Sequence, residues 1–372
     1  MENGGMSGKN GIKRSHNPTH VSSQRKLVLH FDVRNTILVA DSVTNDFVEQ
    51  ALNSYLTGVT WGREANGEWE WVSDKPSLCA PTTNCMTYYK HREKHIVKTP
   101  SDRAILRQVT GDFTQEPLGS RFLPYFNKVL KQLQWPHPSH PDTKLTMTGK
   151  DGNLYHYILP SFFKLIQHLH STKRDFAIVI RTYGLDAPNV LQCIDYSLQG
   201  HHPRFQETPL RYPVNPTPGS ITRDDQRGKI TLQHSQQGSA HTITSEQDIY
   251  RFLSQATGIS GYVDDFTHWQ NNQYNFMAAK PHWLDFHDPS THHIFFDDNL
   301  RVTDEDSIVN VRVFPQGVDH SKAASLDREE ITKLEDVCLV LADLIESTAD
   351  MDYFIKKVQL CETNYKTYLE KL

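Results

Sequence analysis

Cysteine is scarce in this chain, with five residues among 372, odd in number and widely spaced. This pattern excludes a disulfide scaffold and indicates a reducing compartment, so we expect a cytoplasmic protein. Long apolar runs are absent too, because no stretch approaches the ~20 residues that a membrane-spanning helix needs. The opening residues include basic side chains but no apolar segment, so they do not resemble a secretory signal.

A basic excess is also missing. The chain has 39 Lys and Arg against 44 Asp and Glu, which gives a formal net charge of −5. Nucleic-acid-binding domains normally show the opposite balance, so we expect neither nucleic acid nor a membrane as a partner. Hydrophobic residues make up 37% of the sequence. At this length that fraction is enough to bury a sizeable core of one large domain or two smaller ones.

Three short apolar runs predict strands that are buried on both faces, as in a parallel sheet. They cover residues 26–32, 176–182 and 293–297, and a further strand is expected at 309–314. Segments with helical spacing of apolar residues lie between them. Because strands and helices alternate, we expect an α/β fold with a Rossmann-like, doubly wound parallel sheet.

The remaining segments predict how the chain is divided. Two polar, loop-rich stretches follow strand ends and are expected to lie over the sheet edge as caps, and two apolar stripes near the end predict a helical hairpin. That hairpin packs on the main body or presents a docking surface for a protein partner. The expected parts are a disordered tail (1–25), the core (26–58, 151–199 and 258–315), two insertions (59–150 and 200–257) and the C-terminal helices (327–372).

Polar residues stand where the three buried strands end. The first strand ends in Asp32, the second in Thr182, and the third in the pair Asp297 and Asp298. Parallel sheets bind ligands outside the carboxyl ends of their strands, so these side chains should converge. Converging carboxylates repel one another unless a cation lies between them. Hard oxygen ligands in small number favour Mg²⁺, which usually also binds water and substrate phosphate.

At these positions the sequence resembles the haloacid dehalogenase (HAD) superfamily. The resemblance covers the sheet core only and lies in residues 31–36, 179–184 and 294–298, with Lys280 before Pro281 as a further motif. It implies an HAD-like hydrolase or phosphotransferase that acts on a small phosphorylated molecule.

The resemblance also implies roles for individual residues. Asp32 would be the nucleophile that forms an aspartyl-phosphate, and Thr182 and Lys280 would hold the phosphoryl oxygens. Mg²⁺ would be bound by Asp32, the main-chain carbonyl of Arg34, and Asp297 or Asp298. The residues expected to contact the substrate adjoin these motifs: Arg34, Asn35, Tyr183 and Gly184.

Arg34 departs from the pattern of the family's phosphatases, which carry a second Asp at this position as general acid and base. Arginine keeps its proton and cannot do that work. Hydrolysis of an ordinary phosphomonoester should therefore be poor, although attack on a phosphoryl group with a good leaving group stays possible. The alternative is a catalytically degenerate HAD-like protein that serves as a binding or scaffold module.

Two other groups of residues have both a functional and a simpler interpretation. Four histidines precede or begin the third strand (His282, His287, His292 and His293). Their spacing matches no zinc pattern, so we expect solvated loop side chains. Residues 88–95 mix aromatic and basic side chains and would suit contact with phosphates, but such a run is more often a solvated face.

Overall fold

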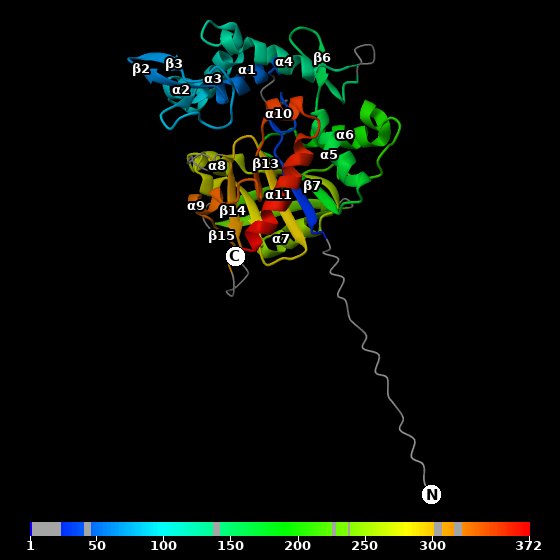
Figure 1. Ribbon diagram of the computed structural model, residues 1–372. Helices are drawn as coiled ribbons and strands as arrows, with labels where there is room; N and C mark the ends of the chain where they lie inside the picture. Colours follow the sequence, from blue (N-terminus) through cyan, green and yellow to red (C-terminus); the bar gives the residue numbers. More distant parts are fainter. Residues whose placement is uncertain are drawn as a thin grey trace.

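The computed structural model describes the chain with a few gaps (Figure 1). The described residues are 1, 24–40, 46–136, 142–224, 228–236, 239–300, 307–315 and 322–372. The disordered tail expected at 1–25 falls mainly on residues 2–23, which lie outside these ranges. Among the described helices, none has both the length and the apolar character that crossing a membrane requires.

A large, mostly parallel sheet forms the centre of the fold. Its order is β10-β9-β8-β11-β7-β1-β13-β16. Neighbouring strands from β8 to β16 are parallel, whereas β9 and β10 are antiparallel additions at one edge. The strands are β1 (Lys26–Phe31), β7 (Phe176–Thr182), β8 (Gly219–Asp224), β9 (Lys229–Gln236), β10 (Ser239–Ile243), β11 (Gly258–Asp264), β13 (Thr291–Asp297) and β16 (Leu339–Leu341). The expected mixed α/β architecture is thus confirmed.

Each face of the sheet is covered by different elements, because side chains alternate along the strands. Leu27, Leu29 and Phe31 pack with α5 (Pro160–Ser171), α6 (Ala187–Tyr196) and α11 (Tyr353–Leu369). Val28 lies on the opposite face with α7 (Glu246–Gln255). A small sheet packs on this second face as well, and its strands are β12 (Lys280–Leu284), β14 (Val309–Val313) and β15 (Ala324–Ser325).

A separate lobe with its own hydrophobic core lies beyond one end of the sheet strands, at the top of Figure 1. In its hairpin, Asn66 and Gly67 both have positive φ, as a two-residue hairpin turn requires. The elements of this lobe are α1 (Val48–Gly58), β2 (Trp61–Ala65), β3 (Glu68–Trp71), β4 (Met86–Thr87), α2 (Tyr88–Ile96), α3 (Arg103–Gly111), α4 (Leu123–Leu133), β5 (Thr146–Thr148) and β6 (Leu154–His156).

The other helices are short and connect these parts. Figure 1 shows α10 between the lobe and the sheet, and Leu344 of α10 belongs to the core of the lobe. These helices are α8 (Phe266–Asn271), α9 (Arg328–Thr332) and α10 (Leu344–Ala349). Single turns of other helix types occur at Pro100–Asp102, Phe113–Gln115, Ser120–Phe122, Ser197–His201, Pro203–Phe205 and Phe276–Ala278.

The structure corrects the expected division of the chain in three places. Helix α1, assigned to the core with 26–58, packs instead with α2, α3 and α4 in the lobe. The second insertion, 200–257, does not form a separate cap, because it contributes β8, β9 and β10 to the central sheet. The C-terminal segment 327–372 is not a plain helical hairpin, because β16 interrupts it and pairs with β13.

The expectation of solvated histidines before the third strand is wrong for three of the four. His282, His292 and His293 lie in β12 and β13 and are at most 4% exposed. His293 bonds to His30 on one side (3.1 Å between ring nitrogens) and to the Ser254 hydroxyl on the other (2.9 Å). Both ring nitrogens of His282 are buried without a hydrogen-bond partner. Only His287 is exposed.

These buried rings should make the protein sensitive to acid. Burial, followed by the charges of nearby basic groups, lowers the pKa of His30 and His282 well below the usual value and that of His293 to about 3. Unfolded histidines titrate near ~6.5, so below that pH the unfolded chain binds more protons than the folded chain. We therefore expect the contribution of these rings to the free energy of unfolding to fall as the pH drops, by up to about 1.4 kcal/mol per pH unit for each ring.

Urea unfolding at about pH 7.5 and about pH 5.5 measures this loss, within the window that the lowered pKa values define. His282→Leu removes two unpaired buried nitrogens, so it should preserve stability at the higher pH and reduce the loss at the lower pH. His287→Leu, at the exposed position, is the control and should leave the loss unchanged. An equal loss in the wild type and in His282→Leu would contradict the prediction.

Candidate functional site

Parallel pairing brings three of the sequence-predicted polar residues to one edge of the sheet. Strand β1 lies between β7 and β13, and all three run in the same direction. Asp32 directly follows β1, Thr182 ends β7, and Asp297 ends β13. The Asp32 amide donates to the carbonyl oxygen of Phe296 at 2.9 Å, so the pairing of β1 and β13 continues up to the site.

Lys280 carries the positive charge at the centre of this edge. Its ammonium lies 2.5 Å from Asp32 Oδ1 and 3.0 Å from Asp297 Oδ2. The side chains of Lys280 and Asp297 are fully buried, whereas that of Asp32 is 10% exposed. Burial lowers the pKa of Lys280, but the charges of Asp297 and Asp32 outweigh that effect and raise it overall. Lys280 is therefore a permanent cation. Burial, together with the charges of Asp297 and Asp298, raises the pKa of Asp32 well above its usual value, and the ammonium of Lys280 opposes that effect.

Asp298 adds a third carboxylate that Lys280 does not neutralise. Carboxylate oxygens of Asp32, Asp297 and Asp298 all lie within 4.8 Å of one another. Burial raises the pKa of Asp298 to about 7, and the charge of Asp297 adds to this effect. When all three are ionised, the carboxylates and the one ammonium carry two net negative charges, which a single divalent cation would balance.

Asn35 provides a further oxygen ligand beside Asp298. Its Nδ2 donates to Asp298 Oδ2 at 3.0 Å, while its Oδ1 is buried without a hydrogen-bond partner. The residue has a positive φ of 57°, a conformation that Asn tolerates better than most residues. An orphaned amide oxygen next to surplus carboxylate charge matches the oxygen ligands that Mg²⁺ and Ca²⁺ take. These residues could therefore hold such a cation.

On the opposite side of Asp32, the turn after β7 presents a hydroxyl. Thr182 Oγ1 accepts a hydrogen bond from the Gly184 amide at 2.9 Å, which leaves the hydroxyl proton free to donate. The ring of Tyr183 stacks on Trp269, and its hydroxyl is buried without a hydrogen-bond partner. Lys280 Nζ lies 5.1 Å from the centre of the Tyr183 ring.

Arg34 is held on the side of the lobe. Its guanidinium pairs with Asp46, just before α1, at 3.7 Å, and its side chain is 30% exposed. The cation between Asp32 and Asp297 is therefore Lys280 and not Arg34. Because Arg34 also lines the cavity described next, it is placed to meet an anionic ligand.

A cavity of about 500 Å³ opens above Asp32, between the sheet edge and the lobe. The strand ends supply Asp32, Thr182 and Asp298, and α2 and α3 supply Tyr89, Arg103 and Arg107. Arg103 pairs with Glu93 at 3.0 Å and lies over the Tyr274 ring at 4.8 Å, so it links the lobe to the body of the protein. The first insertion thus covers the sheet edge, in the position expected for a cap.

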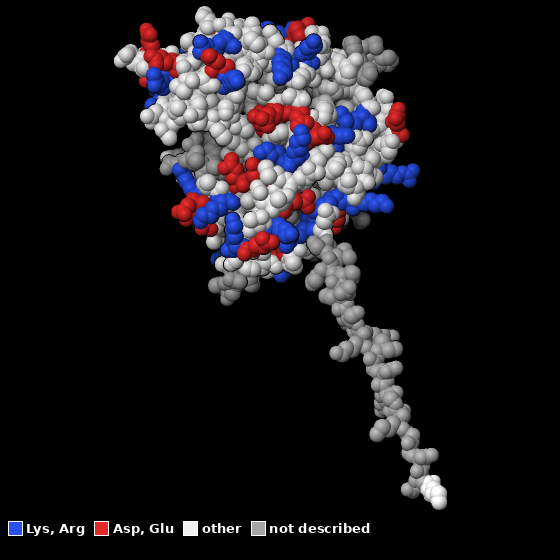
Figure 2. Space-filling model, viewed as in Figure 1, with Lys and Arg blue, Asp and Glu red and all other residues white. Residues whose placement is uncertain are grey.

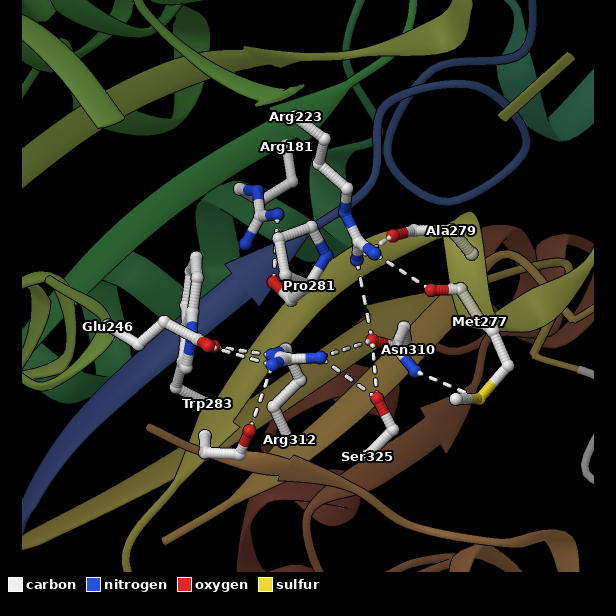
Figure 3. A network of polar contacts seen from close by, with 11 residues as sticks. Arg181, Arg223, Glu246, Met277, Ala279, Pro281, Trp283, Asn310, Arg312 and Ser325 are labelled. Carbon is white, nitrogen blue, oxygen red and sulfur yellow. Dashed lines mark hydrogen bonds and ion pairs between the residues drawn. The ribbon is translucent and has the colours of Figure 1, made fainter. Parts of the chain in front are cut away.

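The peptide groups on both sides of Lys280 are held by two arginines, of which Arg181 is buried and Arg223 is half-buried (Figure 3). Arg181 donates to the Pro281 carbonyl at 3.0 Å and is itself fixed by two hydrogen bonds to Asp264 (2.6 and 2.9 Å). Arg223 donates to the carbonyl of Ala279 at 2.7 Å. With both neighbouring carbonyls anchored, the start of β12 has little freedom to withdraw the ammonium from the carboxylates.

A second layer of this support reaches the small sheet, also shown in Figure 3. Arg312 of β14 is paired with Glu246 of α7 and donates to the Ser325 hydroxyl at 2.9 Å. Asn310 accepts from Arg223 at 3.3 Å and so joins the two arginine clusters. This network therefore supports the chain on both sides of Lys280, through the carbonyl groups of Ala279 and Pro281.

The structure brings together every residue for which the sequence predicts a role at the site. Asp32, Lys280, Asp297 and Asp298 form the charged centre, while Arg34, Asn35, Thr182, Tyr183 and Gly184 line the cavity above it. Sequence reasoning missed the residues from α2 and α3, although Tyr89 lies in the aromatic and basic run at 88–95. Comparisons with protein-family models, curated proteins and solved structures find no match for this chain.

Proposed function

We propose that this protein is an HAD-like phosphohydrolase or phosphotransferase in which Asp32 attacks the phosphoryl group of a small substrate with the help of Mg²⁺. One observation carries the proposal: a carboxylate paired with a buried lysine faces a cavity lined by arginines and a free hydroxyl. In its ionised form, which a divalent cation beside it would favour, such a carboxylate is a competent nucleophile for covalent catalysis.

The roles of the residues follow from their positions. Asp32 forms a bond to phosphorus while the bond from phosphorus to the leaving oxygen breaks, and the electron pair leaves with that oxygen. The Thr182 hydroxyl lines the cavity and binds a phosphoryl oxygen, and the ammonium of Lys280, buried beside Asp32, offsets the negative charge that shifts during transfer. Asp32, Asp298 and Asn35 would hold Mg²⁺, which when bound supplies Lewis-acid stabilisation of the phosphoryl charge. Water or a second acceptor then takes the phosphoryl group from Asp32.

Arg34 restricts which substrates can react. A leaving alkoxide needs a proton from a general acid, and arginine cannot supply it. The substrate class we propose therefore carries a phosphate with a good leaving group, such as an acyl or aryl phosphate. The guanidinium of Arg34, together with Arg103 and Arg107, would bind the rest of an anionic substrate.

A small substrate is favoured over a polyanionic macromolecule by the charge distribution. Figure 2 shows acidic and basic side chains interspersed over the face in view, in keeping with the net charge of −5. The cavity volume of about 500 Å³ also suits a small molecule. An Arg34 side chain between the carboxylates would have favoured the alternative, a catalytically degenerate binding module. Lys280 lies between the carboxylates instead.

Turnover of p-nitrophenyl phosphate with Mg²⁺ tests the proposed chemistry. We expect slow hydrolysis by the wild type and none by Asp32→Asn. Arg34→Asp introduces a general acid and base beside the nucleophile, an effect typically worth ~10²–10⁴-fold, so its turnover should exceed that of the wild type. Arg34→Gln is the matched control without acid–base capacity and should show no such gain. Full turnover in Asp32→Asn would exclude the covalent mechanism.

Thermal unfolding with and without Mg²⁺ tests the proposed cation separately from turnover. An ion that binds only the folded chain stabilises it by about 2.7 kcal/mol at a hundredfold excess over its dissociation constant, so the melting temperature should rise. Asp298→Asn removes a ligand and the surplus charge, so it should abolish the rise. Asp248→Asn, an exposed substitution on α7, is the control and should retain it. A wild type that ignores millimolar Mg²⁺ would contradict the proposal.

A further inference from the structure

A second group of possible metal ligands lies in the lobe, outside the site described above. His91 and His95 are one helical turn apart on α2, and Glu64 lies on the neighbouring strand β2. Glu64 Oε2 is 3.8 Å from His91 Nδ1 and 3.9 Å from His95 Nε2, and the three ligand atoms lie within 4.8 Å of one another. Residues four apart on a helix point to the same side, which explains how one carboxylate meets both rings.

The hydrogen bonds of the rings leave lone pairs facing one another. His95 Nδ1 lies 2.8 Å from the His91 carbonyl oxygen, which can only accept, so Nδ1 carries the proton. In the neutral ring, Nε2 is then an acceptor directed at Glu64. His91 Nδ1 is buried and has no hydrogen-bond partner. Two ring nitrogens and a carboxylate oxygen thus converge with no hydrogen bond between them and no other hydrogen-bond partner for His91 Nδ1.

We propose that Glu64, His91 and His95 bind a divalent transition-metal ion of the Zn²⁺ class. Two imidazoles and one carboxylate are a ligand set that zinc takes, with further positions left for water or another ligand. Bonds of about 2.0–2.1 Å in tetrahedral geometry place ligand atoms about 3.3 Å apart. Glu64 would need to approach each ring nitrogen by roughly half an ångström, and the two ring nitrogens, which lie within 4.8 Å of each other, would close to the same spacing. A bond from the second ring nitrogen to a main-chain carbonyl is also a common feature of metal-bound histidines.

The surroundings keep the ligands in place and distinguish this site from the carboxylate cluster. The His91 ring packs 4.5 Å from the Trp69 ring, centre to centre, and its side chain is only 13% exposed. Glu64 and His95 are 39% and 50% exposed, so an ion can enter from solvent. Imidazole ligands favour zinc over Mg²⁺, which prefers oxygen ligands, so the two sites should select different ions.

Binding at this site would join two elements of the lobe. The ion would link β2 to α2. Helix α2 also carries Tyr89, which lines the cavity, and Glu93, which pairs with Arg103. Zinc would therefore stiffen one wall of the cavity without entering it. The proposal does not depend on the chemistry proposed for Asp32.

Titration calorimetry tests the proposal by adding Zn²⁺ to the metal-free full chain in buffer that contains millimolar Mg²⁺. In a second measurement, the visible absorption of added Co²⁺ reports the ligand set. We expect one zinc ion per chain, bound at least about tenfold more weakly by His95→Gln and by Glu64→Gln. Both positions are half-exposed, so these variants should fold, and a melting curve verifies this. Asp298→Asn should bind zinc like the wild type, which separates the two sites.

His241→Gln is the matched control, because His234 and His241 form another pair of facing rings on β9 and β10, 5.2 Å apart between centres. This pair is not part of a three-ligand cluster among the described residues. Zinc affinity that falls in His95→Gln and Glu64→Gln but not in His241→Gln supports the proposal. Equal affinity in His95→Gln and the wild type, or a loss confined to His241→Gln, would overturn it.

Discussion

The buried ion pairs of Lys280 with Asp32 and Asp297 are the interaction on which the rest of this structure depends. Breaking such a pair by removing one partner typically costs about 3–5 kcal/mol, because an unpaired charge remains buried. The surroundings reflect that constraint. Arg181 and Arg223 anchor the peptide groups beside Lys280, and Asp264 neutralises Arg181 in turn. The small sheet and α7 therefore serve chiefly to deliver one ammonium to the end of β1.

The same charges explain how the sheet and the lobe divide the work. The sheet provides fixed charges at its edge: one lysine, three carboxylates and a hydroxyl. The lobe provides the opposite wall of the cavity with tyrosine and arginine side chains from α2 and α3. Chemistry would thus be set by the sheet and substrate choice by the lobe. Arg34, which pairs with Asp46 at the entry to α1, stands where the two parts meet.

The centre of the site could be predicted from the sequence because its signals are local. An apolar run that ends in Asp32, Thr182 or Asp297 marks a buried strand and its polar end in a single stretch of chain. The wall of the cavity could not be predicted in this way. Helix α2 has Tyr88 as its only buried residue, so no apolar stripe reveals it, and its stability comes from packing against the rest of the lobe.

Tertiary context also overrode two local patterns. Leu341 falls on a helical stripe by spacing, yet Leu339–Leu341 pairs with β13 as β16, because the sheet edge supplies hydrogen-bond partners that periodicity does not reveal. The histidines of β12 and β13 are buried because strand positions on a covered face are excluded from solvent, whichever residue occupies them. In both cases the sheet, and not the local sequence, decided the environment.

If Asp32 is the nucleophile that we propose, it becomes covalently phosphorylated, and the mass of the intact chain reports this change. The protein is mixed with acetyl phosphate and Mg²⁺, quenched in acid, and measured by mass spectrometry with peptide mapping. The proposed mechanism predicts a fraction of chains heavier by one phosphoryl group, located on Asp32 and absent without Mg²⁺. Arg34 cannot activate water, so this species should accumulate. A modification that persists in Asp32→Asn, or an unmodified wild type, would contradict the account.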